Sequence, residues 1–364
     1  MDYLELPTPA LTVDLDVLER NLDRMAAYCR EQGLALRPHT KTHKTPEVAR
    51  MQVDRGASGL TVAKVGEAEV MAAAGLDNIL VAYPIWGSEK LERLARLAQD
   101  REILASIDNE ATAQALSHAA HAMDTTFGIL VEFDAGLHRC GLPPGPECVE
   151  LAQKISKLPG LKFRGLMTFP GNIWGAEEER KQEVKKVAVR FESVMEAFSK
   201  AGMEVEIVSG GSTPSALMSH QIPGLTEIRP GTYVYNDMNT YYQGCCALED
   251  CAAKIVTTVV STAVPGRAMI DAGSKAFSSE SLHAGPATGF GHVVEDPDTP
   301  LIALNEEHGY LDITRSSRTF RVGDVLTVIP NHVCTCVNMY DEVLLLRGGR
   351  VQGTWRVAAR GKVR

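Results

Sequence analysis

The first two-thirds of the chain alternates short apolar runs with amphipathic stretches, and this alternation limits the fold more than any other feature. The stretches between the runs have helical periodicity, and several begin with Thr-Pro, Ser or Asn or end at Gly, which are helix start and stop signals. Such strand–helix units predict an α/β fold, a (β/α)8 TIM-type barrel. An open doubly wound sheet is the main alternative. The eight runs predicted to be strands are 34–39, 59–63, 78–82, 102–107, 126–133, 163–168, 204–208 and 226–233.

The last third of the chain has a different pattern. From about Cys251, short β-rich runs are separated by turn signals such as Gly-Gly and Val-Gly-Asp, and helical periodicity is scarce. We therefore predict two domains, a barrel over residues 1–245 and a β-rich domain over residues 246–364.

Charge and hydropathy exclude several classes of function. The net charge of −9 argues against a nucleic-acid or anionic-membrane surface. The first residues show no basic-then-apolar leader, and no apolar run approaches the length of a membrane span. We expect a cytoplasmic protein that acts on a small molecule.

Polar motifs follow the predicted strands at the points where a barrel keeps its chemistry. HTKTHK follows the first strand, DAGLHRCG the fifth, FPGN the sixth, SGGSTPS the seventh and RPG the eighth. In a (β/α)8 barrel the C-terminal ends of all strands form one rim, where active sites lie and where phosphate docks after strands seven and eight. The motifs therefore collect at one predicted site.

SGGSTPS, residues 209–215, has the composition of a phosphate-binding turn. Two glycines let the backbone approach an anion, and exposed N–H groups and hydroxyls can hold phosphate oxygens. Gly231 and Thr232, in the next loop, add donors. The alternative is an ordinary β–α loop.

Lys41 lies just past the first predicted strand and faces the predicted barrel mouth. A lysine there can form an imine with an aldehyde cofactor, and neighbouring cations favour the reactive amine. Lys44 and Lys64 are weaker candidates, and all three can instead be solvated charges. His39 and His43 can contact the cofactor or be structural. A phosphate turn and an imine-forming lysine on one rim together indicate pyridoxal phosphate.

Six segments together resemble the barrel-type pyridoxal-phosphate enzymes: TPALTVDLDVLERNL, RPHTKTHK, EFDAGLHRCG, VSGGSTPS, EIRPGTYVYND and PNHVCTCVN. The wider group is similar to alanine racemase, and the nearer one is the D-serine dehydratase and D-threonine aldolase family. The resemblance runs from about Thr8 to Gly361. It also implies a homodimer.

The resemblance assigns the imine to Lys41 and places Arg139 near the phenolic oxygen of the cofactor and Arg229 at its pyridine-nitrogen edge. An ion pair of Arg229 with Glu227 or Asp237 is the alternative for that residue. The full predicted cofactor-binding set is His39, Lys41, Arg139, Thr168, Ser209, Gly210, Gly211, Ser212, Thr213, Arg229, Gly231, Thr232 and Tyr233.

PNHVCTCVN is predicted to be a strand that carries two metal ligands. In a strand His332 and Cys334 point to the same side about 6–7 Å apart, whereas Cys336 lies about 13 Å from His332 and is left out. Imidazole and thiolate are a zinc-like pair, and two protein ligands leave open positions for substrate. A buried cysteine beside a structural histidine is the alternative. The resemblance favours a divalent metal, with zinc first and manganese or magnesium as alternatives.

The reaction implied by the resemblance is that of a lyase on D-configured β-hydroxy-α-amino acids, either by β-elimination of water or by retro-aldol cleavage. We favour elimination, because Phe169 and Pro170 stand where the family usually has a histidine after strand six, and because Cys334 resembles the dehydratase pattern. The tyrosine motif of the racemases is not found. The alternatives are an amino-acid racemase, a non-catalytic pyridoxal-phosphate-binding protein, and a barrel enzyme that acts on sugar phosphates.

Overall fold

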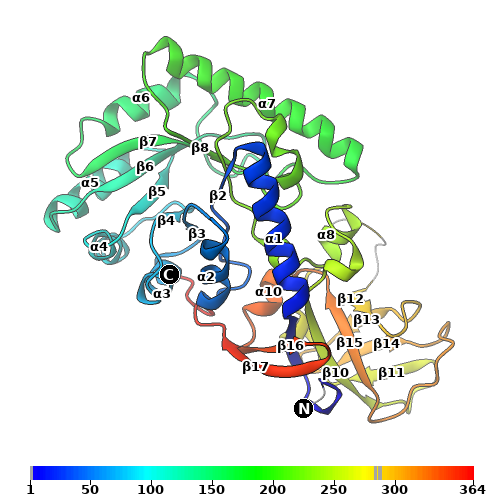
Figure 1. The fold of residues 1–364 in the computed structure, drawn as a ribbon. Helices are drawn as coiled ribbons and strands as arrows, with labels where there is room; N and C mark the ends of the chain where they lie inside the picture. Colours follow the sequence, from blue (N-terminus) through cyan, green and yellow to red (C-terminus); the bar gives the residue numbers. More distant parts are fainter. Residues whose placement is uncertain (1–2, 283–284, 286–288) are drawn as a thin grey trace. The chain divides into compact units, whose positions relative to one another are not determined.

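The computed structural model describes residues 3–282, 285 and 289–364, and it divides the chain into two compact units (Figure 1). We call residues 25–41, 46–231 and 362–364 the barrel unit, and residues up to 24, 42–45 and 232–361 the β-rich unit. Helix α1 (Leu15–Gln32) belongs in part to each. The grouping differs from the predicted division after residue 245, because the N-terminal segment and residues 232–245 join the β-rich unit. That domain boundary stays a prediction.

The strands of the barrel unit form one sheet of eight parallel strands in the order β2-β9-β8-β7-β6-β5-β4-β3. His39, just beyond β2, forms a parallel bridge with Thr61 of β3. This bridge joins the two ends of the strand order, so the sheet closes into a ring. The predicted (β/α)8 barrel is confirmed, and each predicted strand is present. The strands are β2 (Ala35–Leu36), β3 (Leu60–Val62), β4 (Ile79–Val81), β5 (Ile103–Ile107), β6 (Phe127–Glu132), β7 (Leu161–Met167), β8 (Ile207–Gly210) and β9 (Glu227–Ile228).

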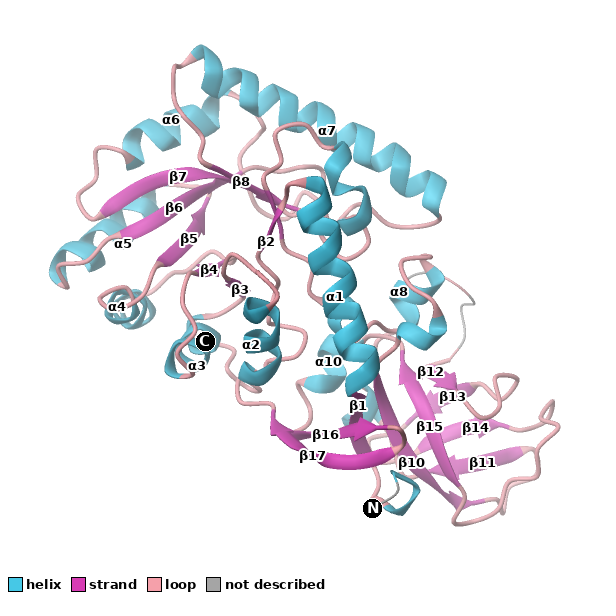
Figure 2. Cartoon of the chain, in the orientation of Figure 1, coloured by secondary structure: helices cyan, strands magenta, loops and turns pink. Residues whose placement is uncertain are grey.

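Helices alternate with these strands along the chain (Figure 2). Each buries one apolar stripe, as α4 does with Leu91, Leu94 and Ala95. Local signals set their ends: the Asn109 side chain accepts a hydrogen bond from the Thr112 N–H and caps α5. The helices are α2 (Pro46–Asp54), α3 (Val65–Ala73), α4 (Ser88–Leu97), α5 (Glu110–Ala122), α6 (Pro146–Ile155) and α7 (Glu177–Lys200), with the 3-10 helix η2 (Ala216–Gln221) after β8.

The inside of the barrel is filled by apolar side chains from neighbouring strands. Leu80, Leu104, Leu130 and Met167, one from each of β4 to β7, form a buried cluster against which Ile207 of β8 packs. Such a layer makes the barrel a solid core rather than a pore. Because the floor is closed, polar chemistry is confined to the ends of the strands.

The β-rich unit is built on a nine-stranded sheet, and the predicted β-rich character of the last third is confirmed. Strand β1 was not predicted: it pairs antiparallel with β10 and parallel with β16, so it is a strand of this sheet. The strands are β1 (Ala10–Asp14), β10 (Ala253–Ser261), β11 (Arg267–Ile270), β12 (Gly291–Val293), β13 (Leu301–Leu304), β14 (Gly309–Asp312), β15 (Val325–Pro330), β16 (Glu342–Arg347) and β17 (Arg350–Arg356).

Short helices complete the β-rich unit: η1 (Tyr3–Glu5), η3 (Thr232–Val234), α8 (Met238–Tyr242), η4 (Leu248–Asp250), α9 (Ser274–Phe277) and α10 (Val333–Val337). The prediction of a strand over the PNHVCTCVN segment is wrong, because β15 ends at Pro330 and His332 caps α10. Over the described residues, no helix is both long enough and apolar enough to cross a membrane.

Candidate active site

A cavity of about 340 Å³ opens at the C-terminal ends of the barrel strands. Its size is within the range of small-ligand and cofactor pockets, about 300–1,000 Å³. It lies at the rim that the sequence motifs indicated. Its lining residues are His39, Lys41, Ala63, Ala82, Tyr83, Pro84, Glu132, Arg139, Cys140, Met167, Phe169 and Arg229.

The structure separates the three candidate lysines. Lys41 lines the cavity, two residues beyond His39, whose Nδ1 accepts a hydrogen bond from the Lys41 backbone N–H. Lys44 is buried in the β-rich unit, where its Nζ donates to the carbonyl of Ala359 at 3.4 Å. The Nζ of Lys64 lies 3.3 Å from the ring centroid of Tyr83. Lys41 is therefore the lysine placed to react inside the cavity.

Phe169 forms an aromatic wall of the cavity between two cations. Its ring centroid lies 5.7 Å from the Lys41 Nζ and 4.7 Å from the Arg139 guanidinium carbon. Both separations are within the range of cation–π attraction. The wall that follows β7 is therefore apolar and carries no titratable group at position 169.

Arg229 lies at the buried end of the cavity in a fixed orientation. Its Nη1 donates to the Ser209 Oγ and its Nη2 to the Thr168 carbonyl, each at 2.6 Å. Burial lowers the pKa of Arg229 to about 10, although the Glu227 and Glu132 carboxylates oppose this shift. The direct ion pair of Glu227 is with Arg37, at 2.7 Å, and Glu227 is linked to Arg229 through the Ser209 hydroxyl.

The predicted phosphate turn is compact and internally bonded. Gly211 has a φ of 74°, which favours glycine, and a Cβ there would lie 3.1 Å from Ile228. The Ser212 N–H donates to the Ser215 Oγ at 3.0 Å. The Ser209 hydroxyl is committed to Glu227 and Arg229 rather than to the turn. Phosphate binding by Gly210, Ser212 and Thr213 stays a prediction.

The residues of the cavity fit a phosphorylated aromatic aldehyde. Lys41, Arg139 and Arg229 outnumber the single carboxyl group of Glu132, which suits an anionic ligand. The buried Oγ1 of Thr168, at the end of β7, has no hydrogen-bond partner among the described residues. An unsatisfied buried hydroxyl costs about 1–3 kcal/mol, so it indicates a position where a bound group supplies the partner.

Glu132 is a cavity residue that the sequence motifs did not reveal. It ends β6, and its Oε2 accepts a hydrogen bond from the Ser106 Oγ at 3.1 Å. Burial raises its pKa, and the Ser106 hydrogen bond and the Arg229 charge offset only part of this effect. The sequence shows only that a glutamate ends a predicted strand. Its burial near Arg229 and Arg139 becomes visible only in the folded structure.

Replacing Glu132 by glutamine should stabilise the cofactor-free protein at about pH 8. A raised folded-state pKa means that the folded chain binds the proton more tightly than the unfolded chain does. Stability is then lost as pH rises from the ordinary carboxyl pKa of about 4.3 through the folded-state pKa, and glutamine removes that loss. We expect a Tm increase of about 1–2 °C that vanishes towards about pH 4. An equal change in Tm at both pH values would contradict the shifted pKa.

In the β-rich unit, His332 and Cys334 lie at the start of α10 and are hydrogen-bonded to each other. The other ring nitrogen of His332, Nδ1, is 3.0 Å from the Oδ2 of Asp237, whose side chain is fully buried. Burial lowers the pKa of His332, but the Cys334 sulfur and the Asp237 carboxylate outweigh it and raise the pKa to about 11. The Cys334 sulfur and the Asp237 carboxylate thus make the surroundings of the His332 imidazole favourable for a positive charge.

This pair fits a divalent cation. In metal sites a carboxylate on one ring nitrogen commonly orients the other nitrogen towards the metal, and Asp237 contacts the Nδ1 of His332 in the same manner. The Asp237 Oδ2 also accepts the Val333 N–H, so the helix start and the imidazole are held by one group. No cluster of three or more metal-ligating side chains occurs among the residues described. The two donors leave coordination positions open, as a catalytic metal requires.

The surroundings of Cys334 include two residues that the sequence linked to other roles. Thr42, which follows Lys41 in the chain, has its Oγ1 3.2 Å from the Cys334 sulfur, and the Thr232 Oγ1 is 3.7 Å from it. Thr232 therefore lies beside the metal pair, and Tyr233 is buried next to it in η3. Cys336 is buried and its sulfur faces the Phe277 carbonyl.

Replacing Asp237 by asparagine should weaken metal binding by about 10- to 100-fold, the usual effect of losing a partner of a metal-ligating histidine. The two oxygens of Asp237 contact the His332 ring and accept the backbone N–H groups of Val333 and Thr240. Asparagine has only one acceptor oxygen for these partners. The measurement is a zinc titration of metal-free protein. Asp296→Asn is the matched control, because this buried carboxylate accepts hydrogen bonds from the hydroxyl groups of Thr299 and Ser316 and from the Asp298 backbone N–H, and its described partners include no histidine. Equal affinities in the two variants would refute the role of Asp237.

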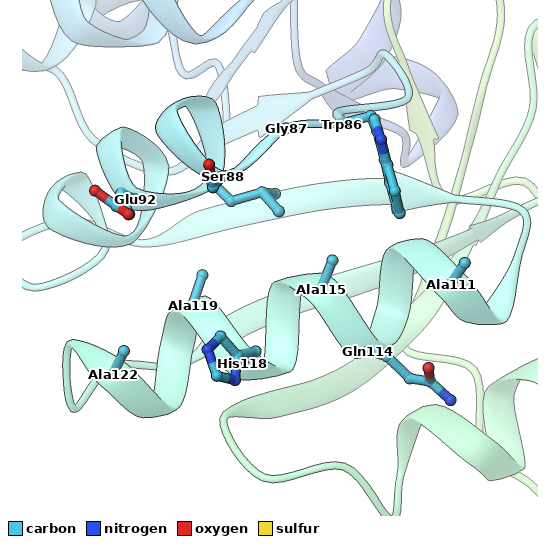
Figure 3. A pocket seen from close by; sticks show the side chains of 11 residues that line it. Trp86, Gly87, Ser88, Glu92, Ala111, Gln114, Ala115, His118, Ala119 and Ala122 are labelled. Atoms are coloured by element: carbon cyan, nitrogen blue, oxygen red, sulfur yellow. The ribbon is translucent and has the colours of Figure 1, made fainter.

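A second cavity, of about 570 Å³, lies between α4 and α5 of the barrel unit. Figure 3 shows alanine side chains of α5 pointing towards the segment that holds Trp86 and the start of α4. The lining is apolar apart from a few side chains such as Glu92 and His118. We therefore assign the chemistry to the cavity that contains Lys41.

Comparisons with known proteins agree with this assignment. Residues 13–239 match the family described as alanine racemase, N-terminal domain, and residues 252–346 match the putative serine dehydratase domain. The D-threonine aldolase of Arthrobacter sp. is 32% identical over 97% of this chain and 93% of its own length. The crystal structure of D-threonine aldolase from Filomicrobium marinum is 32% identical, covers 100% of this chain and 98% of its own, and has a TM-score of 0.93.

A D-threo-3-hydroxyaspartate dehydratase is also similar. Its structure in the metal-free form, with one cysteine replaced by alanine, is 31% identical, covers 98% of each chain and has a TM-score of 0.90. Another structure of this dehydratase has alanine in place of a histidine two positions earlier in its sequence. The predicted family and enzyme class are confirmed. This chain therefore belongs to the family of proteins with an alanine racemase N-terminal domain and a serine dehydratase domain, whose members include D-threonine aldolase and D-threo-3-hydroxyaspartate dehydratase.

Proposed function

We propose that this protein is a pyridoxal-phosphate-dependent, metal-assisted lyase that eliminates water from D-configured β-hydroxy-α-amino acids. The observation that carries the proposal is the pairing of two features in one chain. One is an amine, Lys41, in a cationic cavity at the barrel rim, and the other is the Asp237-oriented His332–Cys334 pair. Zinc is the metal that we propose, because imidazole and thiolate are its preferred protein ligands.

Pyridoxal phosphate, when bound, supplies an electron sink for the bond broken at the substrate Cα, and a divalent metal supplies a Lewis acid for the departing hydroxyl. Lys41, which lines the cavity, would hold the cofactor through its amine, and the same amine, when free, would be the base that takes the Cα proton. Arg139 and Arg229, which line the same cavity, would contact the ring and its anionic groups. His332 and Cys334 would hold the metal, with Asp237 fixing the imidazole.

Elimination is preferred to retro-aldol cleavage for two reasons. Cleavage needs a base that takes the proton of the β-hydroxyl, and Phe169 occupies the wall after β7 without a titratable group. In addition, His332 and Cys334 have the same spacing as the histidine and cysteine replaced in the two dehydratase structures. Retro-aldol cleavage remains the second candidate, because the Arthrobacter and Filomicrobium relatives are D-threonine aldolases.

The test is a product assay with metal-loaded, cofactor-loaded enzyme. D- and L-forms of serine, threonine, phenylserine and 3-hydroxyaspartate are incubated separately, and keto acid, ammonia, glycine and aldehyde are measured in parallel. The proposal expects keto acid and ammonia in equal amounts from D-substrates only. Glycine with an aldehyde would establish the aldolase, inversion without cleavage would establish a racemase, and no product would indicate a non-catalytic binding protein.

The finer predictions about assembly and location belong to the same proposal. We propose a homodimer in the cytoplasm, on the basis of the family resemblance. Sedimentation equilibrium of the purified protein tests the dimer, since the chain mass is 39.5 kDa.

A further inference from the structure

Four buried polar side chains of the barrel unit form one hydrogen-bonded relay that ends at the cavity. The Arg37 Nε donates to the Glu227 Oε2 at 2.7 Å, and the Glu227 Oε1 accepts the Ser209 hydroxyl at 2.6 Å. The same Ser209 oxygen accepts the Arg229 Nη1 at 2.6 Å. The relay ends at Arg229, the one member that lines the cavity. Every member is at most 5% exposed.

The direction of each hydrogen bond follows from the chemistry of the groups. A serine hydroxyl has one proton, and an ionised carboxylate only accepts. The Ser209 hydroxyl donates its only hydrogen to Glu227. Its lone pairs are therefore available to accept a hydrogen bond from Arg229, which can only donate. The carboxylate therefore decides that Ser209 is an acceptor towards Arg229. Arg37 in turn neutralises Glu227 and is itself anchored on the Asn78 carbonyl and side chain.

A second hydrogen bond, to the Thr168 carbonyl, fixes the orientation of the Arg229 guanidinium. Its Nη2 donates to the carbonyl of Thr168 at 2.6 Å, so both terminal nitrogens are fixed from β7 and β8. A planar fork held at both ends cannot rotate, and its remaining N–H groups keep one direction. The buried site strengthens these contacts, because the competing solvent is excluded.

We propose that Glu227 and Ser209 are positioning residues that fix the direction in which Arg229 donates a hydrogen bond into the cavity. This inference rests on the proposed function, in which the acceptor is an atom of the bound pyridoxal phosphate. It also gives Ser209 a role different from the phosphate contact that its motif suggests. The relay acts through Arg229 and touches no ligand itself.

Two substitutions interrupt the relay in different ways. Ser209→Ala removes the acceptor of Arg229. Glu227→Gln keeps the shape but has one acceptor oxygen for two donors, Arg37 and Ser209, so one donor meets an amide N–H group. Ser117→Ala is the matched control, because Ser117 is a buried serine of α5 whose hydroxyl donates to the Pro159 carbonyl and contacts no member of this relay in the hydrogen bonds described.

The readouts are the affinity of the apoprotein for pyridoxal phosphate, the absorption maximum of the bound cofactor, and Tm. We expect Ser209→Ala and Glu227→Gln each to weaken cofactor binding about tenfold and to move the absorption maximum in the same direction. The double variant should cost no more than either single one, since both changes break one relay. Ser117→Ala should lower Tm while binding and spectrum stay as in the wild type.

Folded variants with wild-type affinity and an unmoved absorption maximum would overturn the positioning role and leave the proposed function intact. If only Ser209→Ala fails to fold, Glu227→Gln decides the question. Additive losses in the double variant would also count against a single relay. A wild-type chain that takes up no pyridoxal phosphate would overturn both this inference and the proposed function.

Discussion

Replacing Lys41 by alanine should remove the yellow absorbance of the bound cofactor and lower turnover by about a thousandfold or more. In the proposed function this amine is both the covalent anchor and the base at the substrate Cα, and each role is large in pyridoxal-phosphate chemistry. The cavity places no second lysine on its lining among the described residues. The measurement combines an absorbance spectrum with initial rates on the best substrate of the product assay.

Lys64→Ala is the matched control for this result. Lys64 lies over the Tyr83 ring near the same rim, so its loss changes the charge by the same amount. We expect it to keep the colour and most of the turnover. If Lys64→Ala loses the chromophore while Lys41→Ala keeps it, the anchor has been assigned to the wrong residue.

Replacing His332 by alanine should leave the yellow colour unchanged and lower turnover by about a hundredfold or more. The cofactor stays on Lys41, but the cation loses one of two protein ligands and with it the Lewis acid for the departing hydroxyl. Metal content, measured by elemental analysis after dialysis, should fall in parallel with the rate. Added zinc should restore part of the rate.

The surface histidine His121, at the end of α5, offers a control for this variant. His121→Ala should change neither metal content nor rate. Wild-type rate and metal content in His332→Ala would exclude the proposed metal pair. A loss of both metal and colour would mean that the substitution disturbs the fold rather than the metal alone.

The barrel was predictable from sequence because its strands and helices have strong local signals. Each buried parallel strand is a short apolar run, and helix caps such as Asn109 mark the boundaries between runs. Strand β1 was missed for the opposite reason. Its partners, β10 and β16, lie more than 200 residues away in the sequence, and no local pattern indicates such a pairing.

The metal-ligand pair shows where local reasoning fails. The HVCTCV run is rich in residues that favour strands, yet it forms α10, because the Asp237 carboxylate accepts both the Val333 N–H and the His332 imidazole. This tertiary contact overrides the β propensity of the run. The two ligands still converge, but across a helix start rather than along one face of a strand.

The buried polar residues of the cavity were the hardest to predict. Glu132 and Glu227 both end or begin barrel strands, and nothing in the sequence distinguishes their roles. The fold places Glu227 against Arg37 and Ser209, and it places Glu132 near Arg139 and Arg229. Lys41 was identified correctly as a residue of the rim, because its position depends only on where the first barrel strand ends.

The most direct measurement is borohydride reduction of the protein loaded with pyridoxal phosphate, followed by peptide mapping. Reduction makes the bond between cofactor and lysine permanent, so the modified peptide identifies the anchor. We expect a single labelled peptide with the pyridoxyl group on Lys41. A label on any other lysine, or no label on a protein that has been shown to fold, would contradict it.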